Sequence, residues 1–336
     1  MLRTRRFWIG TFVSLVFIGL LLWKTNLHQV WDAWRHADPR WIVAAVAVYL
    51  ISVWLRAFRY RYILLSRVDL SSAQLFPILM IGYMANNVLP VRAGELVRAY
   101  VLGERYNVSK MFSLGTIAVE RLFDGLALLG LLLATGLLLG VNGVLRGLLF
   151  VTAPVFAVAL AVFIGVLASP AQSEALARRA ISVLPARFRE RAQGLVSGFI
   201  EGLGALRHPR AFAVVAVTSL LTWSLEGAVY SLVGRALGLH FGLGYYIMAT
   251  AAANLAITAP SSQGGIGPYE FFAAQTLILA GAGSSVAAAF ALATHALVII
   301  LATVMGLFFL WRVHLNLGQA VRREEAPLNE AVGSGQ

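Results

Sequence analysis

The sequence contains no cysteine and little charge, and both shortages narrow what the protein can be. With no cysteine in 336 residues, disulfide frameworks, thiolate zinc sites and cysteine nucleophiles are all excluded. Charged residues make up 12% of the chain and hydrophobic residues 59%, with a mean hydropathy of +0.78. Soluble domains carry about 25% charged residues. The composition therefore excludes a water-soluble globular protein.

Histidine is also scarce, and its six copies form no HxH, HExxH or HxxxH pair. A histidine-built metal site is not expected. The isolated His295 lies in an apolar run, where a packed side chain is expected more often than a proton relay. We predict no catalytic residue, no metal and no cofactor, so the protein is not expected to be an enzyme.

The charge that is present is mostly positive. Lys and Arg number 27 against 15 Asp and Glu, which gives a net charge of +12. A basic chain can indicate a nucleic-acid partner, but these cations lie at the ends of apolar runs, where membrane proteins carry their cytoplasmic charges. We therefore expect no nucleic acid among the partners.

Long apolar runs are abundant, and a spanning helix needs about 20 such residues. Two stretches, 74–102 and 245–280, are long enough to cross a bilayer but are broken by Pro, Gly and polar residues. Uninterrupted runs predict six spanning helices, at residues 7–23, 41–65, 111–140, 148–168, 211–239 and 285–311. The predicted fold class is all-α, a polytopic membrane protein.

The distribution of Lys and Arg predicts the orientation. Arg121 and Arg235 fall inside spans, and nearly all the other cations collect on one side of the membrane. The four exceptions are Lys24, Arg35, Arg40 and Arg146. Both termini and segment 169–210 are therefore predicted to be cytoplasmic. Arg56 and Arg59, near the inner end of a span, are expected to extend to the lipid headgroups.

This orientation holds only if each broken stretch returns to the side from which it came. Two full crossings per stretch would satisfy the same condition. Limbs of about 15 residues, too short for a span of about 20, favour two re-entrant hairpins, one entering from the cytoplasm and one from outside.

Three less apolar segments complete the organisation. Segment 26–38 reads as a short interfacial helix on the outer face, and segment 170–208 as an amphipathic helical linker on the inner leaflet. Residues 321–336 read as a disordered cytoplasmic tail. The remainder, residues 1–320, is predicted to form a single transmembrane domain.

The two broken stretches resemble each other in sequence. Asn86 and Asn254 each follow an alanine, and each is followed by a proline and then by a turn that contains glycine. The two asparagines lie half the chain length apart. Trp54 and Trp223, in the preceding spans, lie at nearly the same offset. Three crossings separate the two starting spans, so the repeat is predicted to be inverted, with copies at about 41–140 and 211–311. Inverted repeats with interrupted helices indicate a transporter with a site at the membrane midplane.

Charged and polar residues within the apolar stretches are the candidate site, because a charge at the centre of a bilayer costs about 2.5–3.5 kcal/mol. An internal ion-pair network is the alternative role for the charges, and turn formation is the alternative for the glycines. The candidate substrate-binding residues are Asn86, Arg92, Gly94, Glu95, Arg98, Glu120, Arg121, Asp124, Glu226, Ser261, Ser262, Gly264, Gly265, Gly267 and Glu270.

Two of these segments are suited to an anion. Gly94 and Glu95 are placed in the first turn of a half-helix, and Pro268 at the first position of another. The exposed N–H groups of such helix starts favour a phosphate, which Arg92 or Arg121 would grip through its guanidinium.

At these residues the sequence resembles the transmembrane, flippase-like domain of lysylphosphatidylglycerol synthases, a domain that also occurs alone. The resemblance covers about residues 5–315. It rests on Leu55–Arg59, Gly82–Asn86, Leu89-Pro90, Arg92, Gly94-Glu95, Arg98, Glu120-Arg121, Asp124, Pro260, Gly264–Gly267 and Glu270. It implies an inner-membrane protein that moves an amphipathic lipid between leaflets. The chain has no room for the soluble aminoacyltransferase domain of the synthases, so lysine transfer is not expected.

The leading hypothesis is a lipid flippase of the cytoplasmic membrane. Its substrate would be an anionic or zwitterionic lipid, such as an aminoacyl-phospholipid or a polyprenyl-phosphate-linked molecule. One alternative is an intramembrane enzyme, or an accessory subunit that partners an enzyme of lipid or lipid-linked glycan synthesis. Glu120 and Asp124 would then serve as acids or metal ligands on one helical face. A second alternative is an ion-coupled transporter of small solutes.

Overall fold

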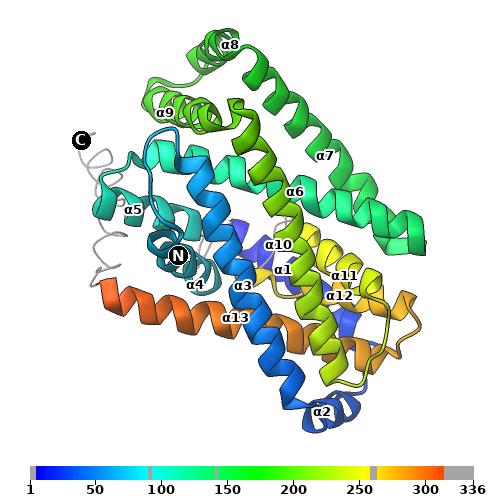
Figure 1. The fold of residues 1–336 in the computed structure, drawn as a ribbon. Coiled ribbons are helices and arrows are strands. Elements are labelled where there is room, and N and C mark those ends of the chain that lie inside the picture. Colours follow the sequence, from blue (N-terminus) through cyan, green and yellow to red (C-terminus); the bar gives the residue numbers. More distant parts are fainter. Residues whose placement is uncertain (1–4, 90–92, 141–142, 258–262, 314–336) are drawn as a thin grey trace, which may run out of the picture.

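The computed structural model describes residues 5–89, 93–140, 143–257 and 263–313. These residues form helices joined by short turns and no β-strand (Figure 1), which confirms the predicted all-α class. The predicted tail at 321–336 lies outside the described residues. The α-helices are α1 (Arg5–Leu22), α2 (Leu27–Arg35), α3 (Pro39–Leu64), α4 (Ser72–Val88), α5 (Gly94–Tyr106), α6 (Lys110–Leu139), α7 (Gly143–Ala168), α8 (Pro170–Ser182), α9 (Ala186–Gly202), α10 (Pro209–Ala236), α11 (Leu243–Ala256), α12 (Pro268–Leu279) and α13 (Ser284–Val313).

Five of these helices are long and apolar enough to cross a membrane: α3, α6, α7, α10 and α13. They correspond to five of the six predicted spans. The sixth predicted span is helix α1, which is followed by α2 at a bend of 82° and reaches the criterion only together with it. The protein is thus a multi-pass membrane protein.

Helices α3 and α10 form an antiparallel pair through the middle of the molecule. At one end the N–H of Asp38 donates to the carbonyl of Ala236 at 2.9 Å. Further along, Arg59 of α3 donates to Ser219 of α10 at 2.8 Å. Figure 1 shows the two helices, in blue and yellow-green, crossing the front of the molecule side by side.

Each broken stretch forms two short helices that pack against each other, as predicted. Helices α4 and α5 have 17 and 13 residues, and α11 and α12 have 14 and 12. At 1.5 Å per residue none reaches the roughly 30 Å of a hydrocarbon core. We name α4–α5 hairpin 1 and α11–α12 hairpin 2. Because α3 and α10 are antiparallel, the hairpins that follow them start at opposite ends of the pair.

Each hairpin also packs against the last span of the other half. In hairpin 1, α4 packs along α13, where Gly306 allows the approach of Met80 and Met84. In hairpin 2, α11 packs along α6, with Gly244 next to Leu139. This exchange of partners is what an inverted repeat would produce. The symmetry and its boundaries remain predictions.

The linker differs from the single amphipathic helix that the sequence suggested. It divides into α8 and α9, and the break falls before Pro185, which ends one helix and precedes the next. Gly198 of α9 lies directly on the backbone of Met111 in α6, and Gly115 of α6 lies on Gly198. The glycines explain why α9 packs so closely on the start of α6.

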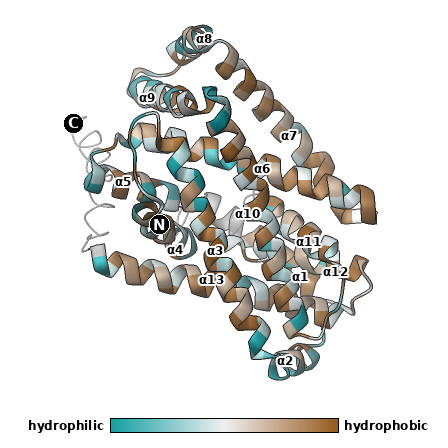
Figure 2. Cartoon of the chain, in the orientation of Figure 1, coloured by the Kyte–Doolittle hydropathy of each residue, from teal (hydrophilic) through white to brown (hydrophobic). Residues whose placement is uncertain are grey.

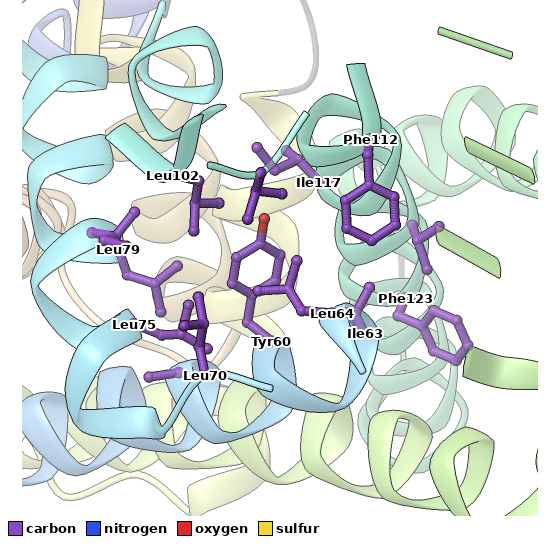
Figure 3. Close-up of a cluster of buried hydrophobic side chains, with 14 of the residues drawn as sticks. Tyr60, Ile63, Leu64, Leu70, Leu75, Leu79, Leu102, Phe112, Ile117 and Phe123 are labelled. Carbon is purple, nitrogen blue, oxygen red and sulfur yellow. The ribbon is translucent and has the colours of Figure 1, made fainter. Parts of the chain in front are cut away.

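The largest buried cluster surrounds the C-terminal half of α3. Figure 3 shows Tyr60 at its centre, surrounded by Leu64, Leu79, Leu102 and Ile117 from four helices. The hydroxyl of Tyr60 lies 3.1 Å from that of Thr116, so its polar end is satisfied inside an apolar core. This packing ties hairpin 1 to α3 and α6.

Hydropathy separates the spans from the other helices. In Figure 2, α7 and α13 are brown along most of their length, whereas α2, α8 and α9 carry much of the teal. The distribution fits a bilayer crossed by the brown helices, with α2 at one end and α8 and α9 at the other.

Candidate functional site

The buried charges predicted from the sequence gather where α3, α5, α6 and α10 meet. The side chain of Arg59 is fully buried. One of its terminal nitrogens contacts Asp124 at 2.6 Å, and the other lies 3.4 Å from Glu120. The expectation that Arg59 extends to the headgroups is wrong, because two carboxylates of α6 hold it inside.

Glu120 is shared by several guanidinium groups. Arg98 contacts one of its oxygens at 2.7 Å, and Arg121 lies 3.3 Å from the other. The guanidinium of Arg98 also lies over the ring of Tyr60, 4.5 Å from its centroid. A side chain at Gly82 would collide with the stem of Arg98, so this glycine makes room for the pair.

A second pair joins α3 to α10. Arg56 contacts Glu226 at 3.0 Å, and the hydroxyl of Ser52 donates to the same oxygen. Arg56 lies over the ring of Trp223, whose indole N–H donates to Asp124 at 3.0 Å. Arg56 is therefore internal as well, which again corrects the expectation that it reaches the headgroups. Trp223 connects the two groups of ion pairs.

Arg121 differs from the other three arginines of this cluster. Its side chain is 45% exposed, against 0–9% for those of Arg56, Arg59 and Arg98. Its nearest carboxylate contact, to Glu120, is 3.3 Å, whereas each of the other three arginines has one at 2.6–3.0 Å. A guanidinium in this position retains donors for a ligand.

Arg121 lines a cavity of about 600 Å³. The polar part of the lining consists of Glu95, Arg121, Asp124 and Asn254. The apolar part comes mainly from α6, α7 and α11 and consists of Ala118, Leu122, Gly125, Leu128, Phe156, Ala159, Leu255 and Ile257, with Trp223 of α10. Both hairpins reach the cavity, hairpin 1 through Glu95 and hairpin 2 through Asn254. Polar and apolar side chains thus line the same space, and α6 contributes both kinds.

Hairpin 1 is held together at the start of α5. The side-chain oxygen of Asn86 accepts the N–H of Gly94 at 2.8 Å, and Glu95 follows in the first turn, as predicted. A side chain at Gly94 would collide with Asn86 and with the carbonyl of Gly82. Asn86 and Gly94 therefore position Glu95 rather than line the cavity.

Hairpin 2 is held by a different set of contacts. Helix α12 starts at Pro268, as predicted, and one oxygen of Glu270 accepts the N–H of Gly267 at 2.7 Å. Its other oxygen lies 2.6 Å from the ring of His295. Three residues of the turn, Gly264, Gly265 and Gly267, have φ of 70, 81 and 102°, a region that favours glycine.

The predicted residues therefore separate into three groups. Glu95, Arg121 and Asp124 line the cavity, and Arg98, Glu120 and Glu226 form the ion pairs next to it. Those that shape the hairpins are Asn86, Gly94, Gly264, Gly265, Gly267 and Glu270. Arg92, Ser261 and Ser262 lie outside the described residues.

Sequence reasoning missed two kinds of residue. Asn254, noted for its place in the repeat, was not assigned to the site, although its position in a broken apolar stretch was a usable signal. Trp223 and Ser219 give no such signal, because a tryptophan or serine is common in apolar helices. Their roles follow from which face of α10 meets α3 and α6.

Glu120 and Asp124 lie one turn apart on α6, which had suggested a cation site. Both carboxylates contact arginines instead. In the described part of the chain, no group of three or more His, Asp or Glu side chains has an arrangement that could hold a metal ion.

Comparison with known proteins gives relatives for nearly the whole chain. The sequence profile of the lysylphosphatidylglycerol synthase TM region matches residues 7–306. Glycosyltransferase AglD of Haloferax volcanii is 30% identical over 355 aligned residues, which cover 95% of this chain and 56% of that protein. The chain thus spans little more than half the length of this relative. No solved structure matches the chain at a significant level.

Two shorter matches are also to membrane proteins. A UPF0104 membrane protein of Methanothermobacter thermautotrophicus is 30% identical over 33% of this chain and 34% of its own length. Another, of Methanocaldococcus jannaschii, is 21% identical over 55% of this chain and 75% of its own length.

Proposed function

The chain belongs to the lysylphosphatidylglycerol synthase TM region family, and from this we propose that it moves an amphipathic lipid between the two leaflets of the cytoplasmic membrane. The observation that carries the proposal is the cavity that both hairpins line, whose lining combines Arg121 with apolar side chains.

The polar part of the lining is suited to a phosphate-bearing headgroup. A guanidinium can bind phosphate through two parallel hydrogen bonds, and Arg121 is the exposed arginine of the cluster. The more buried arginines keep Glu120 and Asp124 neutralised. Glu95, which also lines the cavity, would pair with an amine if the headgroup carried one. An anionic or zwitterionic lipid therefore fits, such as an aminoacyl-phospholipid or a polyprenyl-phosphate-linked molecule.

The apolar part of the lining is suited to lipid chains. Leu122, Leu128 and Phe156 lie on α6 and α7, and α7 has the smallest buried share of the five candidate spans. A headgroup in the cavity would thus have its chains directed past α7 toward the bilayer.

The ends of the molecule supply the orientation that we propose. Helices α8 and α9 lie at the end to which α3 leads, and α2 lies at the opposite end (Figure 1). Exposed arginines such as Arg178, Arg189 and Arg210 concentrate at the first end. We place that end in the cytoplasm, together with both termini.

Lipid translocation in liposomes tests this function. We expect the reconstituted protein to accelerate the movement of a fluorescent phospholipid, measured by chemical quenching of the outer leaflet. Arg121→Gln should slow it about tenfold or more, because a hydrogen bond to a charged group contributes about 1.5–3 kcal/mol. Arg105→Gln is the matched control, since Arg105 is exposed at the end of α5. Equal rates for wild type and Arg121→Gln would contradict the proposed site.

A second candidate function is suggested by one relative. The relative from Haloferax volcanii is named a glycosyltransferase, and the match covers 56% of it. By this analogy the present chain would take part in lipid-linked glycan synthesis, as an enzyme or as the accessory partner of one. A glycosylated lipid product formed by the purified protein would favour an enzyme. Co-purification with a glycosyltransferase would favour the accessory role.

A further inference from the structure

His295 and Glu270 form a buried pair that the proposed lipid site does not use. Their side chains are 6% and 5% exposed, and neither lines the cavity around Arg121. His295 lies on α13 and Glu270 in the first turn of α12, so the pair joins hairpin 2 to the last span. The backbone of the turn before α12 takes part as well.

Both ring nitrogens of His295 face oxygen atoms. Nδ1 lies 2.6 Å from Oε1 of Glu270, and Nε2 lies 3.1 Å from the carbonyl oxygen of Gly264. A carbonyl oxygen can only accept a hydrogen bond, and an ionised carboxylate also only accepts. Neutral imidazole carries a single N–H. Relative to a neutral imidazole with an ionised carboxylate, the pair must hold one additional proton for both contacts to be hydrogen bonds. It is then either imidazolium with carboxylate or imidazole with carboxylic acid.

Loss of that proton would break one of the two contacts. The unprotonated ring nitrogen would then face an oxygen lone pair, either at Glu270 or at Gly264. The remaining oxygen of Glu270 already accepts the N–H of Gly267, so the carboxylate cannot move without releasing the start of α12. The extra proton therefore fastens both the turn and the start of α12 to α13.

The surroundings of the pair contain few other charges. In the described residues the titratable groups that face it are Tyr269 of α12, whose ring stacks on that of His295 at 3.8 Å, and Tyr230 of α10, whose hydroxyl donates to that of Tyr269. One turn before Tyr230 lies Glu226, already paired with Arg56. Among the described side chains of α1 and α4, two uncharged groups lie nearby: Ser14 donates to the carbonyl of Ile266, and Asn87 donates to that of Ile299. No described lysine or arginine contacts the pair.

We propose that His295 and Glu270 are a proton-binding site that holds hairpin 2 against α13 while it is loaded and releases it when the proton leaves. One proton is exchanged with bulk water, and no bond between heavy atoms forms or breaks. The inference deepens the proposed function, because a proton-dependent hairpin would couple lipid movement to proton uptake. The hydrogen-bond chemistry itself does not depend on which substrate is carried.

Cysteine labelling across a pH series tests the site. The chain has no native cysteine, and Ile266, within the turn, is 41% exposed, so Ile266→Cys supplies a single reactive thiol. The rate is measured with a soluble maleimide in liposomes. We expect the labelling rate of Ile266→Cys to rise between mildly acidic and mildly alkaline pH. The rise should be several-fold larger in the otherwise wild-type protein than in a Glu270→Gln background.

Ionisation of the thiol raises the labelling rate with pH in every background, and comparison with Glu270→Gln cancels this effect. The side-chain amide introduced by this substitution can donate to Nδ1 of a neutral His295, which leaves Nε2–H for Gly264, so the hairpin stays fastened at every pH. A His295→Gln background cannot take up the proton at the ring. The ratio of its labelling rate to that of the Glu270→Gln background should therefore not change with pH. The proposal is overturned if the wild-type and Glu270→Gln rates keep a constant ratio, or if His295→Gln retains the wild-type pH response.

These outcomes are separable from the lipid-transport test. A constant labelling ratio together with lipid translocation that depends on Arg121 would reject the proton site and leave the flippase. A pH-dependent ratio without lipid translocation would keep the proton site and reject the flippase.

Discussion

At the scale of single residues, the four arginines of the cluster divide by exposure. Arg56, Arg59 and Arg98 are buried and each has a carboxylate within 3.0 Å, whereas Arg121 is half exposed and more loosely paired. Burial makes a charge dependent on its partner, because no water replaces a lost contact. The first three should therefore act on stability, and Arg121 on ligand binding.

Arg59→Met tests this division. It leaves Asp124 without its closest partner inside the protein, and breaking a buried ion pair costs about 3–5 kcal/mol. We expect a marked fall in the thermal unfolding temperature of the purified protein in detergent. Arg121→Gln should change stability by less than about 1 kcal/mol, so unfolding at similar temperatures in both variants would contradict the division.

At the scale of elements, the hairpins depend on glycines for close contact between their limbs. In hairpin 1, Gly94 lies against Asn86 and Gly82, with no room for a methyl group. In the linker, Gly198 lies against the backbone of α6. Small residues allow helix backbones to approach within membranes, so these positions should tolerate no enlargement.

Gly94→Ala should destabilise hairpin 1. An added methyl group in a closely packed position costs about 1–3 kcal/mol, and displacement of α5 would also move Glu95 at the cavity. The thermal unfolding temperature and the rate of lipid translocation should both decrease. Gly130→Ala is the matched control, because the space beside Gly130 on α6 is open within 4 Å. Wild-type behaviour of Gly94→Ala would show that the limbs can separate without cost.

Gly198→Ala should loosen the linker in the same way. The methyl group would collide with the carbonyl of Met111, and α9 would move away from the start of α6. We expect faster protease cleavage between α8 and α9 than in the wild type. The control is Gly165→Ala on α7, beside which nothing lies within 4 Å. Equal cleavage rates would argue against a tight α6–α9 contact.

At the scale of the whole molecule, the antiparallel pair of α3 and α10 sets the arrangement. Because the pair is antiparallel, the hairpins attached to it begin at opposite ends and meet at the same cavity. Such a layout is typical of transporters that expose one site alternately to two sides.

Labelling from each side of the membrane checks this layout. Leu96 in hairpin 1 and Ile266 in hairpin 2 are 44% and 41% exposed, and both are better cysteine positions than the neighbouring glycines, which are crowded or have positive φ. We expect an impermeant maleimide to label Leu96→Cys faster from the cytoplasmic side and Ile266→Cys faster from the opposite side. Preferential labelling of both from one side would contradict opposed hairpins.

Much of this architecture could be predicted from local patterns. Apolar runs located five of the spans, and Pro and Gly located both hairpins, because span length and backbone geometry depend on short stretches of sequence. Gly94 and Pro268 were placed correctly at helix starts for the same reason. The linker was predicted less accurately, since it was taken as one amphipathic segment although Pro185 is a local signal of a helix break.

The arginines show where local patterns stop being sufficient. Arg56 and Arg59 lie near the end of an apolar run, which on its own is typical of side chains that reach the headgroups. Their burial depends on Glu226, Glu120 and Asp124, which are far away along the chain and meet α3 only after folding. His295 likewise reads as a packed side chain until Glu270 and Gly264 are placed against it.

Residence in the membrane, the all-helical class and the interrupted helices were therefore already encoded in composition and in the spacing of apolar residues. These properties come from solvation and backbone geometry, which act over a few turns. The pairing of each buried charge, and its place at the cavity, in the core or at a hairpin, was decided by long-range packing, because electrostatic partners are chosen by distance in space and not by distance along the chain.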